Sequence, residues 1–226
     1  MINTTLLIPQ QQQNHSLDTS VKHRVNNMID DLMVSLPEIN DLTRAERRGI
    51  IARYTAVLEG NFIYWMTATL LAVQSEDARP ILLDNLHEEI RDAHPAMMRN
   101  FAMAAHAFPT DEDALAVHDD LTNVRLFLGK LSGVQSVLTM AFFEGFIQRF
   151  MAYLADLAKA QGSVDLEYTD VHGVCDIAHT DGLFRALTVE MEVNPLDPKK
   201  DPFEGVNLLR TLIHNIVFNR VEVLVA

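Results

Sequence analysis

Two long apolar stretches, each interrupted by a single carboxylate, constrain the fold of this chain more than any other feature. Residues 54–75 carry one charged side chain, Glu59, and residues 131–148 carry one, Glu144. Both stretches approach the length of a membrane span, but their central acids and several Thr, Ser, Asn and Gln residues favour buried helices of a bundle. Each carboxylate then needs a partner, because burying it alone is costly or forces it to take up a proton.

Two histidines and an aspartate are spaced to share one face of a helix. His172, Asp176 and His179 stand at i, i+4 and i+7, so at 100° per residue they fall within an arc of about 60°. Neutral imidazoles and a carboxylate together suit iron, manganese or zinc. A metal pair shared with Glu59 and Glu144 would satisfy all of these side chains at once. The alternative for either acid alone is a buried salt bridge or a protonated carboxyl group.

An acidic pair precedes a further histidine in a third segment. Glu88 and Glu89 lie six and five residues before His94, which on an uninterrupted helix would point the acid and the histidine in different directions. Pro95 disfavours helical geometry at His94, so a break there could turn its side chain back towards the acids. The competing interpretation of this segment is a solvated, charged helix face.

Apolar periodicity, capping signals and proline positions predict an all-α fold of about seven helices with no hairpin. A capping box of Thr43 and Glu46 marks one helix start, and Gly162 marks a helix end. The predicted helices cover residues 17–33, 43–74, a segment from Pro80 to a break near His94, and residues 111–130, 134–160, 166–192 and 203–221. We expect residues 1–16 to be a disordered tail and residues 17–226 to be one helical domain.

Composition narrows the classes of partner and compartment. The 226 residues carry 18 Lys and Arg against 31 Asp and Glu, a formal charge of −13, which disfavours nucleic acid and anionic membrane surfaces as partners. A single cysteine excludes an intrachain disulfide framework and is typical of the cytoplasm. The first residues lack a basic region and a cleavage site, so we expect no signal peptide. Phosphate-binding and nucleophile-elbow motifs are absent from the sequence.

In the order of these residues the chain resembles the haem-oxygenase-like diiron oxidases and oxygenases. The matching elements are a helix-borne Glu, an Asn-Leu-x-x-Glu followed by His, a further Glu, and a closing His-x-x-x-Asp-x-x-His. The resemblance covers residues 20–220 and implies a seven-helix haem-oxygenase-like bundle with two Fe(II) ions and O2 as co-substrate. It implies seven metal ligands, namely Glu59, Glu89, His94, Glu144, His172, Asp176 and His179. Glu89 is preferred to Glu88 by its place in the motif, and Arg91 stands where many relatives have glycine.

The resemblance implies an O2-dependent oxidoreductase of a biosynthetic pathway. Its substrate would be a small metabolite bearing an amine or a carboxylate, and the reaction N-oxygenation, desaturation or C–C cleavage. The sequence leaves open whether the chain acts alone or as a homodimer. One alternative is a metal-free hydrolase resembling the thiamin-salvage proteins of the same fold, with Cys175 as nucleophile. Another is a non-enzymatic helical interaction protein whose buried polar groups determine its packing.

Overall fold

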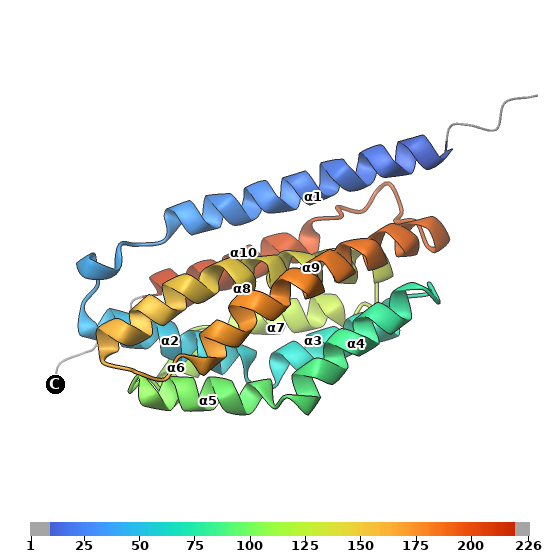
Figure 1. Cartoon of the computed structure of the whole chain (residues 1–226). Coiled ribbons are helices and arrows are strands. Elements are labelled where there is room, and N and C mark those ends of the chain that lie inside the picture. Colours follow the sequence, from blue (N-terminus) through green and yellow to red (C-terminus); the bar gives the residue numbers. More distant parts are fainter. Residues whose placement is uncertain (1–9, 220–226) are drawn as a thin grey trace, which may run out of the picture.

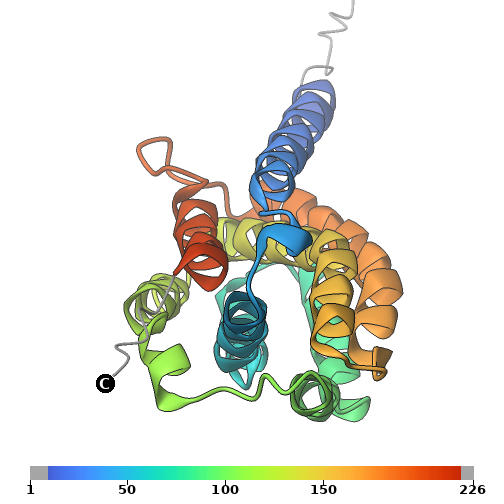
Figure 2. The same ribbon diagram turned by 90° about the vertical axis from the view of Figure 1, so that its left-hand side faces the viewer.

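The structure is a computed structural model that describes residues 10–219, with side chains described from residue 20. Every regular element in this range is helical, which confirms the all-α prediction. Viewed along the bundle, α2 (Arg44–Leu58) and α3 (Asn61–Ala72) lie beneath α8 (Gly133–Gln161) (Figures 1 and 2). On one side are α6 (Asp111–Leu115), α7 (His118–Leu128) and α10 (Glu204–Phe218), and on the other are α4 (Ala78–Arg91), α5 (His94–Ala104) and α9 (Glu167–Val193). In the described range, no helix is both long and apolar enough to cross a membrane.

The longest helix, α8 (Gly133–Gln161), is the centre of the bundle. It contacts α1, α2, α3 and α10 and packs along most of its length against α9 (Glu167–Val193). Almost every residue of its first half is buried, which explains the apolar sequence around Glu144. The helix ends at Gly162, whose φ of 96° is the left-handed geometry that favours glycine. The predicted boundaries of this helix are thus close to the observed ones.

The predicted helix over residues 43–74 is two helices, α2 (Arg44–Leu58) and α3 (Asn61–Ala72). The capping box of Thr43 and Glu46 is present at the start of α2. The chain leaves helical geometry at Glu59, and Gly60 follows with a φ of 80°. Periodicity missed this break, because a single glycine inside an apolar run is compatible with a continuous helix as well as with a turn.

The break predicted at His94 is present, between α4 (Ala78–Arg91) and α5 (His94–Ala104). Ala93 takes a left-handed conformation with a φ of 55°, and Pro95 occupies the first turn of α5. Proline fits there because the first helical residues need no backbone donor for intrahelical bonding. The sequence did not predict that a regular helix follows the break.

The remaining helices differ from prediction mainly at their ends. The predicted helix over residues 111–130 is divided into α6 (Asp111–Leu115) and α7 (His118–Leu128), and α10 (Glu204–Phe218) ends before residue 221, which lies outside the described range. Helix α1 (Gln10–Ser35) begins seven residues earlier than predicted, inside the segment 1–16 that was expected to be a tail. A short 3-10 helix (Ile39–Asp41) links α1 to α2. The rest of the predicted tail, residues 1–9, lies outside the described residues.

Candidate metal centre

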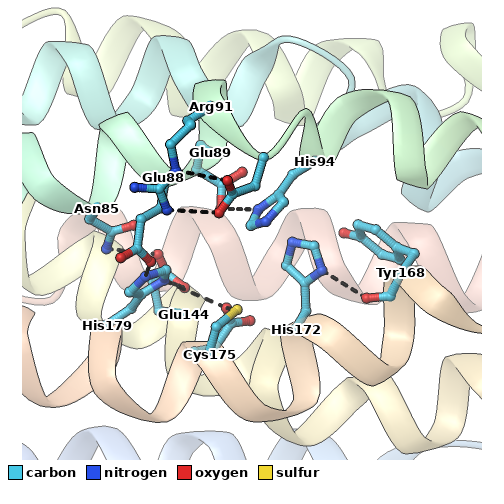
Figure 3. Close-up of polar contacts among 12 residues, drawn as sticks. Asn85, Glu88, Glu89, Arg91, His94, Glu144, Tyr168, His172, Cys175 and His179 are labelled. Atoms are coloured by element: carbon cyan, nitrogen blue, oxygen red, sulfur yellow. Dashed lines mark hydrogen bonds and ion pairs between the residues drawn. The ribbon is translucent and has the colours of Figure 1, made fainter.

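The first group of candidate ligands joins α4, α5 and α9. Glu89, His94 and His172 are all buried, and each offers a ligand atom within 4.8 Å of the others. Glu89 Oε1 lies 2.9 Å from His94 Nδ1, and the rings of His94 and His172 are 4.4 Å apart (Figure 3). The left-handed Ala93 turns the chain back after α4, which brings His94 close to Glu89 despite the short separation in sequence. Of the two interpretations open for this segment, the structure thus shows the one in which the break beside Pro95 turns His94 back to the acid.

The second group lies one turn further along α9. Cys175, Asp176 and His179 offer ligand atoms within 4.8 Å of one another. His179 Nδ1 lies 3.7 Å from Asp176 Oδ1 and 3.9 Å from Oε2 of Glu144, which reaches in from α8. The helical spacing of α9 therefore presents His172 to the first group and His179 to the second, with Asp176 between them. Glu144 is 1% exposed, as its apolar sequence predicted.

Two residues of α4 close the second group on its outer side. Glu88 Oε2 is 2.7 Å from His179 Nε2, and Asn85 Nδ2 donates to Glu144 Oε1 over 3.2 Å (Figure 3). Glu88 thus contacts the second group and Glu89 belongs to the first, whereas the sequence motif indicated only Glu89 as a ligand. Asn85 was missed as a contact of Glu144. Its spacing of three and four residues from Glu88 and Glu89, which places all three on neighbouring positions of α4, is the signal that could have indicated it.

Glu59 is the predicted ligand that the structure does not bring to the cluster. It stands at the C-terminal end of α2, where the predicted helix breaks, and its side chain is 28% exposed. Its carboxylate forms an ion pair with Arg99 of α5. Glu59 is therefore only partly buried, in contrast to the expected burial among apolar neighbours, because the helix ends there and turns at Gly60.

Burial and mutual repulsion perturb the pKa values of the carboxyl groups. Burial, together with the charges of Asp176 and Glu89, raises the pKa of Glu144 well above its usual value. Burial also raises the pKa of Asp176 to about 8. Without a positive partner, these acids are therefore held in their protonated forms.

The two histidines of the first group are shifted in opposite directions. Burial lowers the pKa of His172 to about 4. Burial also acts to lower the pKa of His94, but the hydrogen bond and charge of Glu89 outweigh it and raise that pKa above its usual value. His172 is thus held as a neutral imidazole, the form that can bind a metal.

Three buried atoms around the second group have no hydrogen-bond partner among the described residues. Asp176 Oδ2, His179 Nδ1 and Asn85 Oδ1 make no hydrogen bond within the described part of the chain. A buried polar atom is normally paired, and unpaired ones indicate a missing water or ion. Carboxylate and imidazole donors with raised carboxyl pKa values fit a divalent cation. These buried Glu, Asp and His clusters could therefore hold metal ions.

A cavity of about 20 Å³ adjoins the first group. That volume suffices for one water molecule but not for an organic substrate. Its polar lining comes from the candidate ligands and Tyr168, and its apolar lining is Leu58, Phe62, Ile63, Pro95, Met98 and Ile147. The hydroxyl groups of Tyr168 and Tyr54 share a hydrogen bond of 2.9 Å.

No protein-family model, curated protein or solved structure matches this chain. The resemblance to haem-oxygenase-like diiron proteins therefore stays a prediction. What supports a function for this chain is the chemistry of the buried cluster.

Proposed function

We propose that this chain is an O2-dependent, non-haem diiron oxidoreductase with a haem-oxygenase-like bundle, acting on a small metabolite that bears an amine or a carboxylate. The observation that carries the proposal is the pair of adjoining ligand groups on α9. One group has Glu89, His94 and His172, and the other has Asp176, His179 and the neighbouring Glu144. A single cation could satisfy only one of them.

Charge balance supports two divalent ions. Three buried carboxylates, those of Glu89, Glu144 and Asp176, face the cluster with no cationic Lys or Arg paired to them among the described residues. Two divalent ions with these three acids leave one net positive charge, whereas three ionised acids alone would repel one another strongly in a medium of low dielectric. Ion binding would replace the protons that burial otherwise places on Glu144 and Asp176.

The donor set favours iron over softer or harder ions. Mixed imidazole and carboxylate ligation is typical of ferrous non-haem sites that keep positions open for O2. Burial and the neighbouring Asp176 raise the pKa of the Cys175 thiol, so it stays protonated and is a poor thiolate ligand. Bound iron would supply the electrons that reduce O2.

The residues of the chain position the reactants and exclude water. Helices α4, α5, α8 and α9 each contribute a side chain to the centre, so its geometry depends on the packing of the bundle. Leu58, Phe62 and Met98 line the adjoining cavity and keep bulk water away from the centre. Because the cavity now has room for only one small molecule, an organic substrate requires these apolar side chains to move.

The alternatives are less well supported by the same geometry. A hydrolase with Cys175 as nucleophile needs a thiolate, but the pKa of this thiol is raised and its hydrogen bond is to Asp176 rather than to a histidine. A purely structural role leaves the unpaired atoms of Asp176 and His179 without a purpose. A zinc hydrolase remains as an outcome of the experiment below.

The proposal is tested by anaerobic titration of the metal-free protein with Fe(II), followed by rapid mixing with O2. We expect close to two equivalents of iron to bind and a transient visible absorption to develop after O2 is added. Binding of one equivalent or less, with no transient, would contradict the diiron proposal. Tight binding of Zn²⁺ in place of iron, without O2 reactivity, would indicate hydrolysis instead.

A further inference from the structure

The buried centre approaches solvent on the side of α4 and α9. The ligand side chains Glu89, Glu144 and His179 are 7%, 2% and 8% exposed, whereas Glu88 is 37% exposed while its carboxylate contacts His179. The Glu88 side chain therefore contacts the buried cluster and is also accessible to solvent. Glu88 contacts the second group through His179 but is not one of its grouped ligands.

A cavity of about 270 Å³ opens at this point. Its polar lining includes Asp84, Asn85, Glu88, His179 and Arg185. That volume is more than ten times that of the cavity on the other side of the centre, and it leaves room for a divalent ion with its bound waters. The apolar cavity of about 20 Å³ on the other side of the centre cannot admit such an ion.

Asn85 adds an observation independent of the acids. Its Nδ2 donates to Glu144 Oε1 over 3.2 Å, which leaves Oδ1 as the opposite atom of the amide. Asn85 is 4% exposed, and this Oδ1 has no partner within the described residues. The walls of the cavity thus hold the partly exposed Glu88 carboxylate and the nearly buried Asn85, whose amide oxygen lies below the surface without a partner among the described residues. Carboxylate and carbonyl oxygens are the ligands that divalent cations such as Mg²⁺ and Ca²⁺ prefer.

We propose that the α4–α9 cavity is the entry site for metal ions, where a hydrated divalent cation first binds the Glu88 carboxylate and then, as it loses water, Asn85 Oδ1. The Glu88–His179 contact then opens, and the ion passes to His179, Asp176 and Glu144. This inference rests on the proposed metal centre, and it assigns to Glu88 a role in the rate of ion binding rather than in the filled site. The ion keeps its oxidation state in this step, because it only exchanges bound water molecules for protein ligands.

Charge at the cavity should therefore control the rate of uptake. Glu88 and Arg185 carry opposite charges at the same opening, and Arg185 has no ion pair in the part of the chain that the structure describes. Glu88→Gln keeps a hydrogen-bond acceptor for His179 and removes only the charge. Arg185→Gln removes a charge that repels cations. Glu76→Gln is the matched control, because Glu76 is 91% exposed, lies two residues before the start of α4, and its loss changes the net charge equally.

The experiment follows Co²⁺ uptake by the metal-free protein in a stopped-flow instrument, using the visible absorption of the bound ion. We expect Glu88→Gln to slow uptake by about tenfold or more and Arg185→Gln to accelerate it, while Glu76→Gln stays within about twofold of wild type. All four proteins should bind the same number of ions at equilibrium.

Two outcomes would overturn the entry site. One is a Glu88→Gln protein that fills as fast as the Glu76→Gln control. The other is a Glu88→Gln protein that binds one ion fewer at equilibrium, because Glu88 would then be a resident ligand. A wild-type protein that binds fewer than two Co²⁺ ions contradicts the proposed centre itself, so the two failures are distinguishable.

Discussion

Glu89 and His94 meet across a helix break, with Glu89 Oε1 2.9 Å from His94 Nδ1. The contact joins the last turn of α4 to the first residue of α5, and the left-handed Ala93 lies between them. On a continuous helix these two residues would point apart. The first ligand group therefore depends on the break that Pro95 favours.

Removing Glu89 should empty the first group, whereas removing Glu59 should not. We expect Glu89→Gln to lose about one of two bound ions, because Gln lacks the charge that offsets a divalent cation. Glu59→Gln, which only breaks the exposed pair with Arg99, should keep two. Iron analysis of anaerobically loaded, desalted protein measures both. Loss of an ion from Glu59→Gln would show that this residue moves into the centre when iron binds.

His179 should link iron binding to stability. Wild type should be stabilised by ferrous iron, by about 2.7 kcal/mol at an ion concentration 100 times Kd. His179→Ala should gain much less, because the second group loses a ligand. His87→Ala, an exposed histidine of α4 outside both ligand groups, is the control and should behave as wild type. Anaerobic melting with and without iron decides this, and full stabilisation of His179→Ala would remove it from the ligand set.

Cys175→Ala should leave ion binding and turnover nearly intact. The thiol is half-buried, its pKa is raised by burial, and its hydrogen bond is to Asp176. Metal stoichiometry and O2 uptake with a substrate panel are the measurements. A variant that binds two ions but loses turnover would favour the nucleophile interpretation.

The metal-free protein should lose stability between about pH 6.5 and 8. Burial raises the pKa of Asp176 to about 8 and that of Glu144 above its usual value, so the native state holds protons that the unfolded chain releases. Stabilisation from a raised pKa is fully present below the unfolded value and is lost as pH rises through the folded value. The raised pKa of His94 acts in the same direction.

His172 has the opposite effect, but only at lower pH. Burial lowers the pKa of His172 to about 4. Its contribution to the free energy of unfolding is therefore present above its pKa in the unfolded chain, about 6.5, and is lost as pH falls towards 4. Melting temperatures at constant ionic strength should therefore fall from pH 6.5 to 8 in wild type and fall less in Asp176→Asn. A wild-type profile that rises over this range would contradict the assignment of uncompensated acids.

A substitution at Gly133 tests the packing between the start of α8 and the end of α9. A Cβ at Gly133 would lie 2.1 Å from Oε1 of Glu190, a fully buried carboxylate that accepts from the backbone amides of Gln74 and Ser75. Gly133→Ala should therefore reduce the free energy of unfolding by about 2–4 kcal/mol.

Gly173→Ala is the control for that substitution. The nearest atom to its Cβ is Met151 Cβ at 3.9 Å, an ordinary contact, so this helical site should gain up to about 1 kcal/mol. Denaturant unfolding measures both. Equal stabilities for the two variants would show that Glu190 can move without cost.

By itself, the sequence determined the helical class and much of the centre. The spacing of His172, Asp176 and His179 places the three side chains on the same face of a helix, because side-chain direction repeats every 3.6 residues. The apolar stretch around Glu144 required burial on any helix, and Pro95 indicated the break beside His94. These are local properties, which neighbouring residues decide.

Only the tertiary structure decided which acids meet which histidines. Glu59 and Glu144 have similar apolar surroundings in sequence, yet a turn at Gly60 sends Glu59 to Arg99 while Glu144 stays on the continuous helix α8. Glu88 and Glu89 are adjacent and chemically identical, and the packing of α4 against α9 separates them, one to His179 and the other to His94. Such pairings depend on the relative placement of whole helices, which residue spacing within one helix cannot specify.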